Sequence, residues 1–136
     1  NNLKADFLPH GQCSFAVEGN IISIDATGPW NIEFFNKMHD ELKSIIINNV
    51  DNQNFAVLLI LKGVPLATKN GLDCHIKFVS TGKTKALAIY SRLSESPAIA
   101  ESTFQKAYTQ AGLKNKTFDS IEAAKIWLSS QLTKLY

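Results

Sequence analysis

The most restrictive feature of the sequence is an unbroken apolar run from Phe55 to Leu61. A half-exposed strand alternates apolar and polar residues, whereas a strand covered on both faces is apolar throughout. The run therefore predicts a central strand of a sheet that has other elements packed on both sides. A shorter apolar stretch from Ala86 to Tyr90 predicts another strand.

Apolar residues spaced three and four positions apart predict helices between these strands. One such pattern covers residues 31–50, with Asn31 as its N-cap. A second covers residues 69–80, where Leu72, Ile76 and Val79 are expected to share the inner face. A third begins at Pro97, because proline is favoured in the first turn of a helix. Three amphipathic helices are therefore expected before the end of the chain.

The two ends of the chain complete the pattern. Alternation on either side of Gly19 and Asn20 predicts an antiparallel hairpin, since both residues tolerate a tight turn. Thr117 and Phe118 predict a short last strand, and Asp119 is expected to cap a closing helix.

Strands that alternate with helices are typical of parallel pairing. We therefore predict one α/β domain over residues 1–136, with a mixed, mostly parallel sheet of four to five strands and about four helices. The length fits a single domain with a sizeable core. Residues 1–11 are expected to form a flexible N-terminal segment.

Composition excludes several classes of protein. The hydrophobic share of 45% and the charged share of 19% are those of an ordinary globular domain. A net charge of +2 is too small to indicate nucleic-acid binding. The two cysteines, Cys13 and Cys74, are expected to be reduced and buried. The sequence has no apolar run of membrane-spanning length and no signal peptide pattern, so we expect no integral membrane segment and a cytoplasmic location.

The familiar short motifs have structural interpretations here. Gly82-Lys83-Thr84 lacks the leading glycine of a phosphate-binding loop and precedes a strand, so it is interpreted as a connection. Cys74 and His75 are helix neighbours that point about 100° apart, which favours a core cysteine flanked by a histidine over a catalytic pair. The spacing of the histidines resembles no zinc site, and no metal is expected.

The adjacent acidic residues and the two tryptophans also have structural interpretations. Asp40 and Glu41 are expected on a solvated helix face. Trp30 is expected in the core or at its rim, and Trp127 is expected to pack the last helix against the sheet rather than to form a binding platform.

Positive charge is concentrated in one segment. Residues 62–92 carry six Lys and Arg against one Asp, a net +5. Lys62, expected at the carboxyl end of the central strand, and Lys69, at the start of the next helix, would lie where α/β sheets commonly bind ligands. The alternative is that these lysines are scattered over a solvated face.

The chain resembles the SpoIIAA-like family, which includes the STAS domains and a looser branch described as SEC14-like. The resemblance rests on the order of elements, on the run Asn54 to Val64, on the turn Asn70 to Leu72, and on the ending Phe118 to Leu128. The antagonist branch of this family carries Asp-Ser-Ser-Gly-Leu at that turn, with a phosphorylated serine. Here the turn reads Thr68-Lys69-Asn70-Gly71-Leu72. The phosphoserine switch therefore does not carry over.

The resemblance implies a non-enzymatic binding or regulatory module without a cofactor or catalytic residue. Its partner is expected to be a protein, or a small apolar or anionic ligand, bound near residues 64–72. The residues expected to make that contact are Lys62, Thr68, Lys69, Asn70, Gly71 and Leu72. The alternative is a small enzyme whose site assembles around Lys69, Asp73 and His75.

Overall fold

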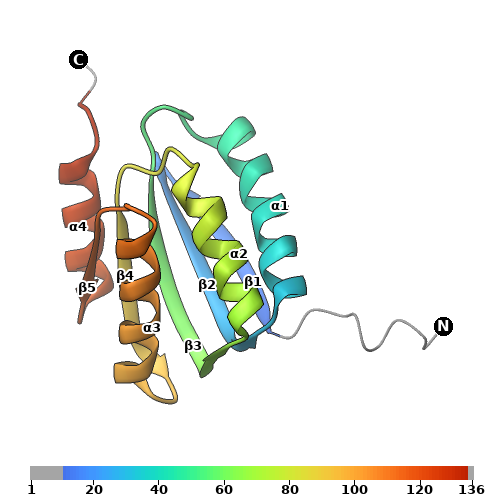
Figure 1. Cartoon of the computed structure of the whole chain (residues 1–136). Helices are drawn as coiled ribbons and strands as arrows, with labels where there is room; N and C mark the ends of the chain where they lie inside the picture. The colour runs from blue at the N-terminus through green and yellow to red at the C-terminus, as the bar shows by residue number, and fades with distance from the viewer. Residues whose placement is uncertain (1–10, 135–136) are drawn as a thin grey trace.

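The structure is a computed structural model that describes residues 11–134. The described chain forms five strands and four helices: β1 (Gln12–Glu18), β2 (Ile21–Trp30), α1 (Ile32–Asn49), β3 (Ala56–Ala67), α2 (Lys69–Ser80), β4 (Leu87–Ser94), α3 (Pro97–Gln110), β5 (Asn115–Phe118) and α4 (Ile121–Gln131) (Figure 1). Apart from Gly11, the segment 1–11 that we expected to be flexible lies outside the described residues.

The strands form a single mixed sheet in the order β1-β2-β3-β4-β5. The hairpin β1–β2 is antiparallel, and the other three pairings are parallel. Each of α1, α2 and α3 connects one strand to its parallel neighbour. The predicted fold class is therefore confirmed, including the hairpin and the mostly parallel sheet.

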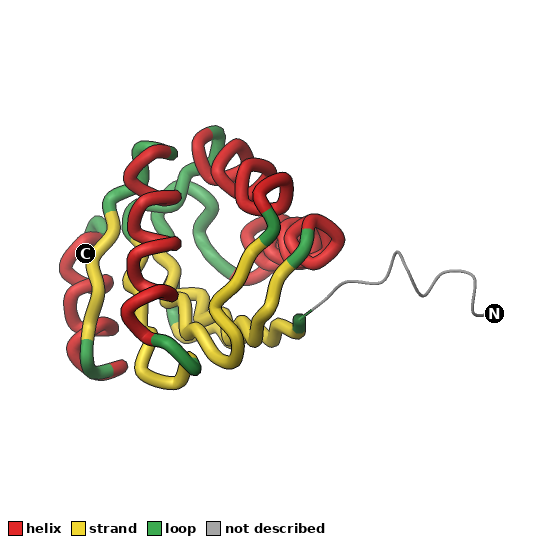
Figure 2. The backbone as a smooth tube through the Cα atoms, turned by 60° about the horizontal axis from the view of Figure 1, so that its bottom comes forward, coloured by secondary structure: helices red, strands yellow, loops and turns green. Residues whose placement is uncertain are grey.

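Helices cover both faces of the sheet, three on one side and one on the other (Figures 1 and 2). Because alternate residues of a strand point to opposite faces, β3 contributes to two separate cores. Val57, Leu59 and Leu61 pack beneath α1, α2 and α3. Ala56, Leu58 and Ile60 pack beneath α4. This double burial is the physical reason for the continuous apolar run in β3.

The strand β3 is longer than the apolar run that predicts it. It continues through Pro65 to Ala67, which pairs with Trp30 of β2. Proline has no amide hydrogen for a ladder, and the register of β2 against β3 shifts at this point. Lys62 consequently lies within β3 rather than at its carboxyl end, which corrects the position expected for it.

The helix starts follow the expected chemistry with one correction. Asn31 caps α1 as predicted, since its side chain accepts a hydrogen bond from the backbone amide of Phe34. At α4 the cap is Ser120, whose hydroxyl accepts from the Ala123 amide at 3.1 Å. Asp119 is one residue too early to cap this helix. None of the described helices is long and apolar enough to cross a membrane.

Candidate functional site

Five of the six residues predicted to bind a partner lie at and just before the first turn of α2, and Lys62 lies within β3. Thr68 is the N-cap, and its hydroxyl oxygen accepts a hydrogen bond from the Gly71 amide at 3.2 Å. Lys69 and Asn70 are exposed, Gly71 is buried and Leu72 is half-buried. Thr68 and Gly71 therefore have structural roles in starting the helix.

Both lysines of the predicted basic edge lie beside carboxylates. The Lys62 ammonium is 2.8 Å from Asp25 on the neighbouring strand β2. The Lys69 ammonium is 2.9 Å from Asp73, one turn further along α2. Ion pairs at this exposure are weak, typically about 0–1 kcal/mol. Both ammonium groups at this edge nevertheless have a carboxylate partner.

The three residues of the alternative enzyme site are not brought together. Lys69 and Asp73 form their ion pair at the surface. His75 is 4% exposed and lies on the inner side of α2. This corrects the expectation that Cys74 fills the core with His75 at its flank: Cys74 is half-buried and donates to Asn36 at 3.5 Å.

His75 is the middle member of a buried hydrogen-bonded chain. Its Nδ1 lies 2.8 Å from His39 Nε2 of α1, and its Nε2 lies 2.9 Å from the Tyr108 hydroxyl of α3. His39 is 5% exposed and Tyr108 is 2% exposed. The two imidazole rings stack on each other, and His39 also stacks on Phe78 with ring centroids 3.9 Å apart. Three helices are thus joined by two consecutive hydrogen bonds inside an apolar layer.

The chain of hydrogen bonds has two self-consistent directions. In one, the Tyr108 hydroxyl donates to His75 Nε2, and His75 Nδ1–H donates to His39 Nε2. In the other, His39 Nε2–H donates to His75 Nδ1, and His75 Nε2–H donates to the Tyr108 oxygen. Both directions keep every group neutral. In the second, the Tyr108 hydroxyl hydrogen is free to donate elsewhere.

Burial keeps all three groups uncharged near neutral pH. Burial, aided by the neighbouring His39, lowers the pKa of His75 to about 3. Burial also lowers the pKa of His39 to about 4, with Lys43 adding to this effect and Asp40 opposing it. The pKa of Tyr108 is raised well above its ordinary value, again by burial. Neutral groups of this kind orient a ligand or pass a proton between tautomers without creating a buried charge.

An enclosed apolar cavity of about 60 Å³ lies beside this chain. His75 and Tyr108 line it, and the rest of its lining is mainly aliphatic and aromatic. Most of the apolar residues come from β2, β3 and β4 below and from α1 and α2 above, and Phe55 and Leu113 come from loops: Ile24, Met38, Leu42, Ile46, Phe55, Val57, Leu59, Phe78, Val79, Leu87 and Leu113. We call this space the inner cavity.

An open groove of about 310 Å³ adjoins the inner cavity at the surface. It lies at the carboxyl-terminal ends of α1 and α2, and we call it the outer groove. The two spaces share lining residues: Ile46, Phe55, Phe78, Gly82 and Lys83. Lys83 belongs to the Gly82-Lys83-Thr84 segment, which connects α2 to β4 as predicted. The outer groove is lined by the segments that lead into β3 and β4, whereas Thr68 and Lys69 follow the carboxyl end of β3. Figure 1 shows these two ends of the strands on opposite sides of the molecule.

The remaining candidate residues lie at the surface, in the core or partly buried between the two. Asp40 and Glu41 are exposed on α1. Trp30 is 1% exposed and belongs to the core, and Trp127 packs α4 against the sheet beside Phe118. Cys13 is free and half-buried, and burial, aided by Glu41, raises its thiol pKa to about 11. Among the described residues, no three His, Cys, Asp or Glu side chains are grouped to hold a metal ion.

Sequence reasoning missed the contact between His39 and His75. The signal was present in the helical spacing, because His75 lies three residues after Leu72 and four before Val79. The inner face of α2 therefore runs through Leu72, His75 and Val79 rather than through Ile76. Sequence spacing does not show which residue of α1 lies beside a given residue of α2. The contact between the two histidines is therefore visible only in the folded structure.

The fold has a known counterpart. The sequence matches no protein-family model and no curated protein. The structure is similar to the crystal structure of an uncharacterised protein of the DUF3478 family from Shewanella loihica, which has a SpoIIAA-like fold. The TM-score is 0.60 at 16% sequence identity, and the match covers 89% of this chain and 95% of the other.

The domain therefore has a SpoIIAA-like fold, as the sequence resemblance predicts. At this level of identity the likeness establishes the fold alone. Function has to be argued from the residues of this chain.

Proposed function

We propose that this domain is a non-enzymatic SpoIIAA-like binding module whose ligand is a small apolar molecule that lies in the outer groove and inserts one end into the inner cavity. The observation that carries the proposal is an enclosed apolar space with a few convergent polar groups, here His75 and Tyr108. Ligand sites commonly have this composition. The proposal keeps the predicted class of ligand and moves its site to the other end of the sheet.

Energetics favour an occupant over an empty space. At about 24 cal/mol per Å³ of cavity, 60 Å³ left unfilled costs roughly 1.4 kcal/mol. Water is a poor occupant of an apolar cavity, because it needs two to four polar partners. An apolar group that entered from the outer groove would recover part of this cost.

The polar chain suits binding better than catalysis. His39, His75 and Tyr108 are bonded to one another and are neutral near pH 7. The described lining includes no cysteine, serine or carboxylate, and its one amine, Lys83, is an exposed lysine at the mouth of the outer groove. Threonine is present only as Thr84.

The test is a titration of methyl-labelled protein with octan-1-ol, followed by nuclear magnetic resonance. We expect saturable shifts of the methyl groups of Leu59, Val79 and Leu87, which line the inner cavity. Leu66 and Leu93, which are 61% and 53% exposed at the far end of the sheet, serve as internal controls. Shifts confined to those two residues, or none at all, would reject the inner cavity as the site.

Recognition of a protein partner near residues 64–72 is a second candidate. This end of the sheet carries the exposed side chains of Leu66 and Leu93. Ile99, in the first turn of α3, is also 50% exposed at this end. Together with Lys69 they place apolar and charged groups at the same end of the sheet. Protein captured from a lysate of the native cell by the wild type, and not by the double variant Leu66→Ser, Lys69→Ala, would favour this candidate.

A further inference from the structure

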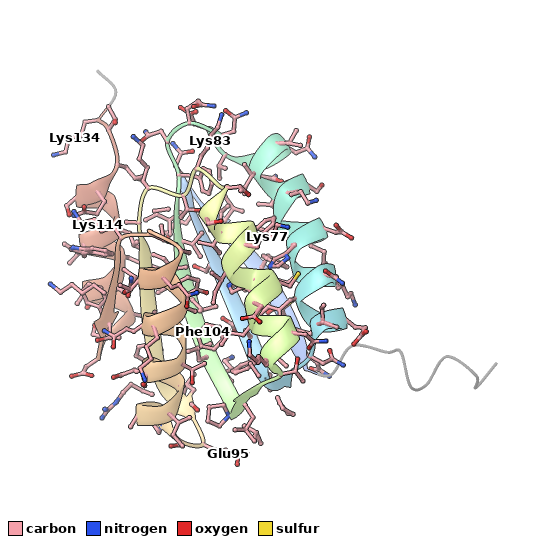
Figure 3. All side chains as sticks on the ribbon, in the orientation of Figure 1. Lys77, Lys83, Glu95, Phe104, Lys114 and Lys134 are labelled. Carbon is pink, nitrogen blue, oxygen red and sulfur yellow. The ribbon has the colours of Figure 1, made fainter. Side chains whose placement is uncertain are left out.

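The outer groove combines an apolar floor with positive charge. Lys43 of α1 and Lys83 of the α2–β4 connection line it, together with the neutral polar side chains of Asn52 and Thr81. Among residues 11–134, no carboxylate lines the groove. Figure 3 shows Lys83 beyond the carboxyl-terminal end of α2, while Lys77 projects from the same helix further down.

The two ammonium groups are accessible to a ligand. Lys83 is exposed. Lys43 is 61% exposed, and its contact with Asp40 is a loose one of 3.8 Å between two exposed side chains on α1. Such a pair contributes little and is easily exchanged for another carboxylate.

The ends of α1 and α2 oppose this charge only in part. Each helix C-terminus carries a partial charge of about −0.5. Two helix ends therefore offset about half of the two formal positive charges. The groups that line the groove therefore keep a net positive charge.

We propose that the ligand is an amphipathic carboxylate, with its anionic head at Lys43 and Lys83 and its alkyl chain directed through the outer groove into the inner cavity towards Tyr108. This inference rests on the proposed function and adds the chemical class and the orientation of the ligand. The inner cavity of about 60 Å³ accommodates only the end of a chain, and the groove of about 310 Å³ accommodates the remainder.

The experiment compares octanoate with octan-1-ol by calorimetric titration of the full chain. These probes share the length of their carbon chain and differ in head-group charge. We expect octanoate to bind more tightly, and we expect its advantage to fall as salt is raised, because exposed charges are screened. Lys43→Ala and Lys83→Ala should each weaken octanoate by about two- to fivefold. Octan-1-ol should be weakened by a smaller factor, because it loses contact with the lysine stem but no charge interaction.

Lys77→Ala is the matched control. It removes the same charge from α2 at an exposed position that lines neither space. We expect it to leave both affinities unchanged. A loss of octanoate binding equal to that of Lys83→Ala would show that general surface charge is responsible, which overturns the proposed head-group site.

Orientation is tested in the wild-type protein, so that no variant needs to fold. Nuclear Overhauser contacts are expected from the terminal methyl group of bound octanoate to the ring protons of Tyr108. Shortening the probe to hexanoate should weaken binding by about fourfold for each methylene removed. Methyl contacts to Thr81 and Lys83 alone would reverse the orientation and overturn the inference.

Different results would reject the proposed apolar site and the proposed carboxylate ligand. If octan-1-ol shifts the cavity methyl groups but binds as tightly as octanoate, the carboxylate inference is wrong and the apolar site stands. If octan-1-ol does not reach those methyl groups, the proposed function fails in its own experiment.

Discussion

At the scale of single residues, the buried contact of His39 with His75 is the least expected feature of the chain. Two imidazoles 2.8 Å apart inside an apolar layer require that at least one be neutral, and burial keeps both so. The contact also joins α1 to α2 and, through Tyr108, to α3. These residues therefore connect the stability of the helical layer to the wall of the inner cavity.

Stability should depend on pH because of these two histidines. Their pKa values are about 4 for His39 and about 3 for His75 in the folded chain, against about 6.5 in an unfolded one. Below pH 6.5 the unfolded state therefore binds protons that the folded state does not. The free energy of unfolding should be constant above that pH and should fall as pH drops from 6.5, by about 1.4 kcal/mol per pH unit for each histidine.

Urea unfolding at pH 7.5, 6.0 and 5.0 measures this dependence above the range in which most carboxylates titrate. The triple variant His39→Phe, His75→Phe, Tyr108→Phe replaces the polar chain by apolar rings, which is less disruptive than removing one partner. It should show a much flatter profile. An equally flat profile in the wild type would contradict the assignment of neutral buried histidines.

At the scale of elements, the start of α2 is shaped by its contact with the start of α1. A side chain at Gly71 would place its Cβ 2.8 Å from Thr68 Oγ1 and 3.0 Å from the backbone of Asn31 and Ile32. The Gly-Leu pair on which the family resemblance partly rests is thus explained by packing. It needs no functional role at that turn.

Gly71→Ala should therefore destabilise the domain, although alanine is the better helix former by about 1 kcal/mol. Overpacking against backbone typically costs about 1–3 kcal/mol, so after the helix gain is subtracted we expect a net loss of up to about 2 kcal/mol in urea unfolding. Gly82→Ala is the control, because its Cβ would meet only Val79 and Phe78 carbonyl oxygens, at 3.4 and 3.7 Å. A Gly71→Ala variant as stable as the Gly82→Ala variant would show that α2 can shift away from α1.

Element boundaries show where sequence reasoning succeeds. Periodicity and cap residues predict α1, α2 and α3 to within about a residue, because these signals are local. The strand β3 extends past the predicted end at Leu61 because pairing with β2, a non-local contact, continues to Ala67. The cap of α4 is Ser120 rather than Asp119, because the helix begins at Ile121 and the cap is the residue immediately before it.

At the scale of the whole molecule, the sheet separates two unlike layers. One side carries α4 over a core of small and aliphatic residues. The other carries α1, α2 and α3 over an aromatic core that includes Phe34, Phe35 and Phe104. The inner cavity lies in the three-helix layer, where α1, α2 and α3 meet above the sheet.

The fold could be predicted from the sequence, whereas the inner cavity could not. Alternation of strands and helices, the apolar run in β3 and the family resemblance specify the architecture. A cavity depends on how side chains from β2, β3, β4, α1 and α2 fail to fill one space, and no local pattern encodes that. The predicted site at Lys62 and Lys69 followed a general rule for α/β sheets, but the structure places a carboxylate beside each lysine.

The central claim is that a ligand occupies the space beside Tyr108. The most direct measurement is a crystal structure of the full chain purified from its native cell, inspected for density that no residue explains. We predict elongated density that runs from Lys43 and Lys83 through the outer groove to the Tyr108 hydroxyl. Density beside Thr68 and Leu72 with an empty inner cavity would contradict the account.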